Sequence, residues 1–120
     1  MQVFQVEGTD QTPRVILDKG KGLFEFSGRS LTDKAIEFYR PIVAWITEYS
    51  KSPNSRTDLV FKMEYMNTAS SKVLFDLFAI AQNIPGAKIV WCFHDEDEDM
   101  EETGEEFSSL VRIPFEMRAY

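Results

Sequence analysis

Short apolar runs follow one another along the chain at two different spacings, and each spacing predicts a type of element. In Arg14–Asp18 and Leu23–Ser27, β-branched and aromatic residues form two short runs, separated by the glycine-containing Lys19–Gly22. Two such runs joined by a short turn with glycine are typical of a β-hairpin. We therefore expect the first part of the chain to contain two antiparallel strands.

An amphipathic helix is predicted next, because the apolar residues change to helical spacing after Gly28. Thr32 or Asp33 is a suitable N-cap, and Ser52–Ser55, which contains a proline, ends the element after about Tyr49. The apolar side chains form two adjoining stripes, which give the helix a wide buried face. The stripes are Ile36, Tyr39, Val43 and Ile46, and Phe38, Ile42, Trp45 and Tyr49.

The second half of the chain alternates strand and helix signals. Asp58–Met66 alternates in the manner of a strand, while Ala69 to about Asn83 has helical spacing. Ala87–Phe93 is a nearly continuous apolar run, the pattern of a strand buried on both faces. A short helix around Glu105–Leu110 and a final strand at Val111–Met117 complete the chain. This order predicts an α/β fold, with a mixed, partly parallel sheet of four to five strands packed with helices.

Size and composition agree with one domain spanning residues 1–120. Hydrophobic residues make up 43% of the 120 residues, enough to fill one core without disulfides. Cys92 is the only cysteine, so no internal disulfide forms and a reducing compartment is expected. No basic start precedes an apolar run, and no stretch approaches the roughly 20 apolar residues of a membrane span. We expect a cytoplasmic protein that does not insert into membranes.

The net charge of −7 is concentrated in one segment. Residues 95–106 contain nine of the 20 acidic side chains and no Lys or Arg, while the other 108 residues carry 11 acidic and 13 basic side chains. An acidic segment without a basic stripe elsewhere repels phosphate backbones and anionic membranes. Nucleic acid is therefore excluded as an expected partner.

The acidic segment invites comparison with a calcium-binding loop. Asp95, Asp97, Asp99 and Glu106 occupy the first, third, fifth and twelfth positions of an EF-hand loop. Met100, however, stands where the sharp turn of that loop requires glycine, and the segment follows a strand rather than a helix. We interpret residues 95–106 as a solvated loop or a partner-facing acidic surface, and expect no metal.

Few residues are arranged for catalysis. Cys92 and His94 share a face of one predicted strand, but no third group is positioned to orient them. Cys92 lies in an apolar run, where a cysteine is usually a small core residue. Phosphate-binding glycine loops and nucleophile motifs are missing. We expect neither catalytic residues nor a cofactor, and hence a protein that is not an enzyme.

The junction Tyr65–Lys72 leads from a strand directly into a helix through hydroxyl and amide side chains. Asn67 or Thr68 is suited to cap the free N–H groups of the first turn, which is worth about 1 kcal/mol. The same N–H groups and the positive end of the helix also favour an anion. A phosphate on Thr68 would place roughly −1.5 to −2 charges there, with Lys72 one turn further as a counter-charge. The residues alone are compatible with both interpretations of this junction, a helix cap and a phosphorylation switch.

Four stretches of the sequence together resemble one family of bacterial regulatory phosphoproteins, the SiaC family. The distinctive one is the junction Tyr65–Ser70, similar to the Tyr-x-Asn-Thr-x-Ser pattern of that family. The others are Gly8–Pro13, Phe38–Trp45, and the acid-rich Trp91–Phe107 followed by Pro-Phe-Glu. They extend over nearly the whole chain in the same order.

This resemblance implies a STAS-like fold, related to the anti-sigma-factor antagonists. It implies that a dedicated protein kinase phosphorylates Thr68 and that a PP2C-type phosphatase reverses the modification. The unphosphorylated form would bind and activate a diguanylate cyclase, linking the switch to cyclic-di-GMP, aggregation and biofilm formation. A STAS-like anti-sigma-factor antagonist in a partner-switching pathway is the nearest alternative. A small ligand- or metal-binding protein using residues 95–106 is another.

Two positions depart from the family pattern. Thr32-Asp33 replaces a frequent Pro-Glu, a change expected to be silent. Ala69 replaces a frequent serine, which removes one competing phosphorylation site and leaves Thr68, with Ser70 and Ser71 as lesser candidates. Partner binding is expected on the surface around the second helix start, and phosphate on Thr68 is expected to weaken it by repulsion or by the cost of desolvation. The expected partner-binding residues are Asn67, Thr68, Ser70, Ser71 and Lys72.

Overall fold

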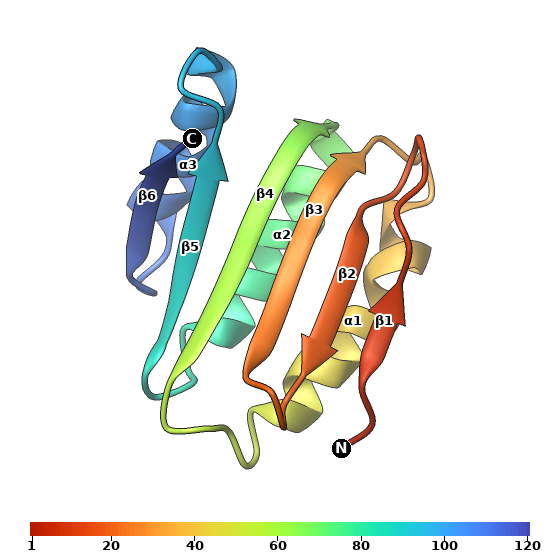
Figure 1. The fold of residues 1–120 in the computed structure, drawn as a ribbon, viewed down its shortest axis with the longest axis vertical. Helices are drawn as coiled ribbons and strands as arrows, with labels where there is room; N and C mark the ends of the chain where they lie inside the picture. The colour runs from red at the N-terminus through yellow and green to blue at the C-terminus, as the bar shows by residue number, and fades with distance from the viewer.

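A six-stranded mixed sheet forms the centre of the computed structural model, which describes residues 1–120 (Figure 1). The strands lie in chain order from β1 to β6. The pairs β1–β2 and β2–β3 are antiparallel, and the three remaining pairs are parallel. The elements are β1 (Phe4–Val6), β2 (Arg14–Asp18), β3 (Leu23–Ser30), α1 (Ala35–Tyr49), β4 (Thr57–Met66), α2 (Thr68–Ala81), β5 (Ala87–Phe93), α3 (Glu98–Leu110) and β6 (Phe115–Ala119).

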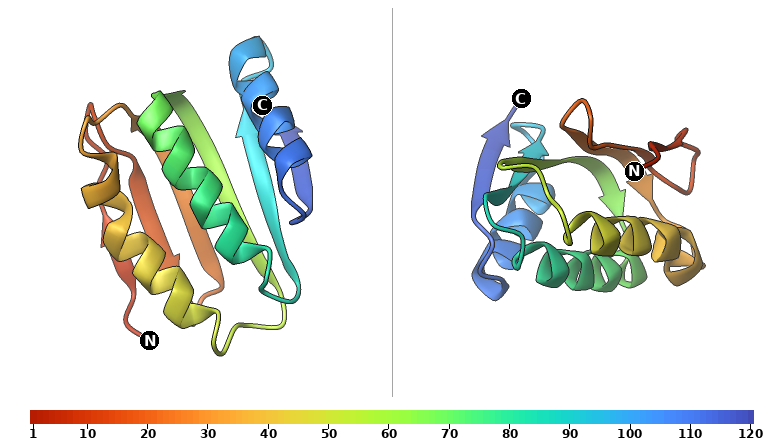
Figure 2. Two further views of the ribbon diagram at one scale, coloured as in Figure 1. Left: turned by 180° about the vertical axis from the view of Figure 1, so that it is seen from behind. Right: turned by 90° about the horizontal axis from the view of Figure 1, so that it is seen from below.

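All three helices cover the same face of the sheet (Figures 1 and 2). Each connects two neighbouring parallel strands, and the strands are added in one direction from β3 to β6. Because such crossovers are right-handed, a succession of them in one direction places every helix on one side. The opposite face of the sheet carries no helix. No helix combines the length and the apolar character that a membrane span requires.

The core is one cluster of 24 buried hydrophobic residues, most of them between the sheet and the helices. Its centre is aromatic: Phe78 of α2 meets Phe61 of β4 edge-on, with ring centroids 5.2 Å apart. Trp91 of β5 is fully buried and lies 5.6 Å from the ring of Phe107 in α3. The indole N–H of Trp91 donates to the carbonyl of Met100 at 3.0 Å. These contacts fix α2 and α3 on the sheet.

The strand β5 is buried on both faces, as its apolar run predicted. Val90 and Cys92 lie on the face that no helix covers, yet they are only 2% and 8% exposed. Lys62 and Arg118 lie beside Cys92 in the neighbouring strands. The aliphatic stems of such side chains shield apolar surface while their charges stay in water. Neighbouring strands, rather than a second layer of helices, therefore cover this face of β5.

The α/β class with a mixed sheet is as predicted, but the predicted number of four to five strands is wrong. The missed strand is β1, whose Phe4 pairs with Leu17 of β2. Three residues are too few for an alternating pattern to stand out in the sequence. The last strand also begins at Phe115 rather than Val111. The intervening Pro114 belongs to the connection, where its carbonyl accepts a hydrogen bond from Ile89.

The helix α1 begins at Ala35, with Lys34 as its N-cap residue, so the predicted caps Thr32 and Asp33 are wrong. The hydroxyl oxygen of Thr32 instead accepts a hydrogen bond from the N–H of Lys34 at 3.0 Å, which closes a turn just before the helix. Of the two predicted apolar stripes, only Ile36 is exposed, at 68%.

The acidic segment is helical from Glu98 onward, and the predicted loop with a short helix from Glu105 is wrong. Asp97 caps this helix, since its carboxylate accepts a hydrogen bond from the N–H of Met100 at 3.0 Å. Acidic residues in the first turn also suit the positive end of a helix. The charges of this segment therefore lie on an ordered surface, α3.

Candidate functional site

The junction between β4 and α2 is held by the backbone and side chain of Asn67. Its side-chain carbonyl accepts a hydrogen bond from the N–H of Ser70 at 2.8 Å, so Asn67 is the N-cap of α2. Its amide group donates to the carbonyl of Thr32, and its backbone N–H donates to the carbonyl of Ser30, both at 3.0 Å. Of the two capping residues that the sequence allowed, the structure selects Asn67.

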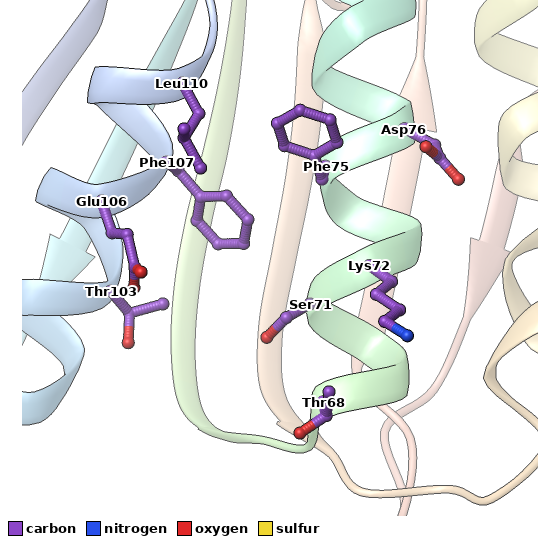
Figure 3. A pocket seen from close by; sticks show the side chains of 9 residues that line it. All are labelled: Thr68, Ser71, Lys72, Phe75, Asp76, Thr103, Glu106, Phe107 and Leu110. Carbon is purple, nitrogen blue, oxygen red and sulfur yellow. The ribbon is translucent and has the colours of Figure 1, made fainter.

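Thr68 is thereby left without a capping role. It is the first residue of α2, its side chain is exposed, and none of the hydrogen bonds at the junction involves its hydroxyl. Figure 3 shows Thr68 at the very start of the helix. A phosphate can be attached here without breaking an existing interaction.

Ser70 does not lie on the surface, although it was expected among the partner-binding residues. Its exposed fraction is 0%, and its hydroxyl donates to the carbonyl of Ser30 at 2.9 Å. The hydroxyls of Ser70 and Ser30 are 2.7 Å apart, and that of Tyr39 lies 2.8 Å from Ser30. The three hydroxyls form a buried chain joining α2, β3 and α1. Ser70 therefore stabilises the junction from its buried side.

The phenol of Tyr39 is strongly affected by this buried position. Burial raises the pKa of Tyr39 to about 12, and the hydrogen bond with Ser30 opposes only part of that rise. In the unfolded chain the phenol titrates near pH 10. The protonated phenol therefore stabilises the fold fully below about pH 10, and this stabilisation is lost as the pH rises through about 12.

We expect Tyr39 to cost the fold about 1.4 kcal/mol of stability between pH 8 and pH 11, because the unfolded state loses the proton first. The measurement is urea-induced unfolding of the wild type and of Tyr39→Phe at both pH values. Tyr39→Phe is expected to lose less stability than the wild type over this interval, by about that amount. Equal losses in the two proteins would show that Tyr39 does not titrate differently on folding.

An open groove of about 500 Å³ lies beside the junction, between α2 and α3. Figure 3 shows Phe107 reaching from α3 toward α2, with Phe75 on the facing side of α2. Thr68, Ser71 and Lys72 lie along the first turns of α2 on the same groove. Three of the five expected partner-binding residues thus line this groove, and a fourth, Asn67, caps the end of α2 beside it. The complete lining is Thr68, Ser71, Lys72, Phe75, Asp76, Thr103, Glu106, Phe107 and Leu110.

The residues considered for metal binding and catalysis are arranged differently. No three His, Cys, Asp or Glu side chains converge into a metal-binding group, and Asp97 is engaged as a helix cap. His94 lies 3.2 Å from the carboxylate of Asp95. Cys92 is not hydrogen-bonded to His94, and burial raises the pKa of its thiol, which opposes the thiolate form. The sequence pair Cys92 and His94 therefore does not form a nucleophile and its base.

The apolar part of the groove was missed by the sequence analysis. Phe75 is 37% exposed and Leu110 is 62% exposed. Phe75 falls outside the apolar stripe of α2, and a large apolar residue on the polar side of a helix is a detectable signal. The buried pair of Ser30 and Tyr39 gives no such signal, because its partner Ser70 is distant in the sequence.

Comparison with known proteins identifies a family and solved structures that this chain resembles. The sequence matches the family described as SiaC family regulatory phosphoprotein over residues 6–120. SiaC of Pseudomonas aeruginosa has the same fold, with a TM-score of 0.88 at 22% identity, covering 100% of both chains. No curated protein matches the sequence.

Two further structures from Pseudomonas aeruginosa share the fold. A chain in the crystal structure of the diguanylate cyclase SiaD in complex with its activator SiaC has a TM-score of 0.88 at 22% identity, covering 98% of this chain and 99% of that chain. Apo-SiaC has a TM-score of 0.85 at 22% identity, covering 99% and 100%. These likenesses confirm the fold predicted from the sequence.

Proposed function

The chain belongs to the SiaC family of regulatory phosphoproteins, and we propose that Thr68 is the residue that carries its regulatory phosphate. The observation that carries this proposal is the separation of two roles at the start of α2. Asn67 caps the helix, whereas the neighbouring hydroxyl of Thr68 is exposed and unbonded. A kinase can therefore reach Thr68 without unfolding the junction.

The proposed partner of the unphosphorylated form is a diguanylate cyclase, which this protein activates. Support comes from the Pseudomonas aeruginosa structure of the diguanylate cyclase SiaD in complex with its activator SiaC. One chain of that structure shares the fold over 98% of the present chain. A protein kinase and a PP2C-type phosphatase complete the proposed cycle, as the family resemblance implies. Partner binding uses the exposed or half-buried residues Asn67, Thr68, Ser71 and Lys72, with Ser70 positioning them from below.

Phosphate on Thr68 changes this surface in two ways. It adds roughly −1.5 to −2 charges beside the free N–H groups of α2, which favour an anion, and one turn from Lys72. It also adds volume at the edge of the groove, which Thr68 lines. A partner seated on this surface must displace the phosphate or desolvate it, and both weaken binding.

The first test locates the phosphate and the partner together. The protein is purified from its native cells, its phosphorylation is mapped by peptide mass spectrometry, and co-purified proteins are identified. We expect phosphate on Thr68 and a diguanylate cyclase bound to the unphosphorylated fraction. Thr68 unmodified under all growth conditions would contradict the switch. Capture of an anti-sigma factor would support the partner-switching pathway instead.

We further expect phosphothreonine at position 68 to weaken binding of the captured cyclase at least about tenfold, which is about 1.4 kcal/mol. The measurement is calorimetry with site-specifically phosphorylated protein. Phosphoserine at Ser52 is the matched control, because Ser52 is exposed and follows the end of α1 at the opposite end of the helix layer (Figure 1). Equal weakening by both phosphates would point to net charge rather than to the junction.

A further inference from the structure

An open hollow of about 490 Å³ lies where the four parallel strands end. Each strand supplies one lining side chain at or just beyond its carboxyl end: Arg29 from β3, Tyr65 from β4, His94 after β5 and Tyr120 after β6. Figure 1 shows these four strands pointing toward the same edge of the sheet. Open α/β sheets bind small ligands at this edge, and the volume is within the range of ligand pockets. We call it the strand-end hollow.

An irregularity in β4 directs Tyr65 into this hollow. The pairing of β4 with β3 passes from Met63 directly to Tyr65, which leaves Glu64 as an extra residue, as in a β-bulge. Met63 is buried and Met66 packs against the core, so the bulge leaves Glu64 and Tyr65 together on the exposed side, with Tyr65 56% exposed. Bulges are frequent beside binding sites because they redirect side chains in this way.

Two aromatic rings of the hollow each have a cation over one face. The guanidinium carbon of Arg29 lies 5.1 Å from the ring centroid of Tyr65, and the ammonium of Lys62 lies 4.2 Å from that of Tyr120. His94 meets the ring of Tyr120 edge-on, with ring centroids 5.8 Å apart. A flat aromatic ligand can stack on such rings, whereas a cationic ligand would compete with Arg29 and Lys62 for the ring faces. The arrangement therefore favours a flat ligand without positive charge.

Lys62 is suited to bind an anionic group of such a ligand. None of the ion pairs involves Lys62. Strand pairing places it in a row across the uncovered face of the sheet that contains three cations and no carboxylate. The row is Arg14, Ser27, Lys62, Cys92 and Arg118. A phosphate beside the hollow therefore meets the ammonium of Lys62, and hydrogen bonds between two charged groups are the strong ones.

Two carboxylates in the lining of the hollow distinguish between flat bases. That of Asp97 accepts the capping hydrogen bond of α3, whereas that of Glu64 meets Arg29 only at 4.0 Å and keeps oxygens free. An ionised carboxylate only accepts hydrogen bonds. Guanine offers it two adjacent donors, a ring N–H and an amino group, whereas adenine offers an amino group beside an acceptor nitrogen. Glu64 therefore favours guanine over adenine.

We propose that the strand-end hollow binds a guanine nucleotide. The base stacks on Tyr65 and donates two hydrogen bonds to Glu64, and the phosphate groups bind Lys62. Lys62 and Tyr65 are three residues apart on β4, or about 10 Å along a strand, which is comparable with the distance from the base of a nucleotide to its phosphates. This inference goes beyond the proposed function and does not rest on it, because neither Thr68 nor a partner protein takes part.

The test is a titration of the isotope-labelled, unphosphorylated full-length protein with GDP, with amide resonances followed by NMR. We expect GDP to shift the resonances of Arg29, Tyr65, His94 and Tyr120, and ADP to bind about tenfold more weakly, because a matched pair of hydrogen bonds discriminates between bases by about that factor. Absence of GDP-induced shifts at these residues, or equal binding of ADP, would overturn the proposal. The same shifts produced by inorganic phosphate at the same concentrations would also overturn it, because an anion alone would then be recognised.

Variants at exposed positions separate the contacts of the hollow from the overall charge. Tyr65→Ala removes the stacking ring and Lys62→Ala the phosphate contact, and each is expected to weaken GDP binding about tenfold. Glu64→Gln is expected to reduce the preference for GDP over ADP to about twofold or less. Lys21→Ala makes the same charge change as Lys62→Ala in the turn between β2 and β3, at the opposite edge of the sheet, and is expected to alter affinity less than about twofold. Equal effects of these two lysine variants would overturn the hollow as the site.

Discussion

Replacing Trp91 by alanine is expected to lower the free energy of unfolding by about 3–5 kcal/mol, the range for removing a large buried aromatic side chain. Trp91 is fully buried and its ring lies 5.9 Å from that of Phe61 and 5.6 Å from that of Phe107. Its indole N–H also donates to the carbonyl of Met100, so alanine leaves a cavity and removes this hydrogen bond.

The measurement is urea-induced unfolding, followed by circular dichroism. Since natural domains are stable by only about 5–15 kcal/mol, Trp91→Phe is a second variant that keeps most of the volume and should lose less than Trp91→Ala. Tyr65→Ala is the control, because Tyr65 is 56% exposed, and it is expected to cost well under half as much. Comparable losses for Trp91→Ala and Tyr65→Ala would contradict the central place of Trp91.

The sequence predicted those elements whose signals are local. The hairpin of β2 and β3 and the strand-to-helix junction at Thr68 are each defined by a few adjacent residues with turn or capping chemistry. The strand β1 is different, since three residues gain their place only by pairing with β2. Local patterns do not report such pairing.

The start of α3 was available in the sequence but was masked by charge. Asp97 is followed by acidic residues in the first turn, the usual signature of a helix N-terminus. Read as a run of charge, the same residues indicated a solvated loop. A capping residue ahead of an acidic first turn is therefore a more specific signal of structure than the density of charge.

The candidate site was predicted only in its exposed half. Thr68 and Lys72 follow from the chemistry of a helix start, which is local. The burial of Ser70 follows from its contact with Ser30, 40 residues earlier, and the groove follows from α3 packing beside α2. Both arise from the packing of elements distant in the chain, so a local pattern does not reveal them.

In the proposed switch, the cap of α2 and the phosphate acceptor are different residues, Asn67 and Thr68. A cap that also served as the phosphate acceptor would lose its hydrogen bond on modification, which costs about 1 kcal/mol. Because the side chain of Asn67 holds the first turn, the proposed phosphorylation of Thr68 would change the surface and leave the capping bond in place. In the proposed switch, the signal would therefore be carried by charge and volume on an unchanged fold.

Gly104→Ala is expected to destabilise the protein by about 1–3 kcal/mol, the usual cost of overpacking a core. Helix propensity alone predicts the opposite sign, since alanine is favoured over glycine in a helix by about 1 kcal/mol. Gly104, however, faces the indole of Trp91: an added Cβ would lie 2.4 Å from its Cδ1 and 2.8 Å from the methyl carbon of Met117. The indole is not free to withdraw, because it is fully buried and its N–H donates to the carbonyl of Met100, in the same helix as Gly104.

The matched control for Gly104→Ala is Ser108→Ala, at an exposed position one turn further along α3, where the change is expected to stay within about 0.5 kcal/mol. Thermal unfolding of the two variants and the wild type measures the difference. Since α3 must move outward to accommodate the methyl group, Gly104→Ala should also shift the amide resonances of Phe75 and Phe107 across the groove. A higher unfolding temperature for Gly104→Ala would mean that propensity prevails and that the contact of α3 with Trp91 is looser than the structure shows.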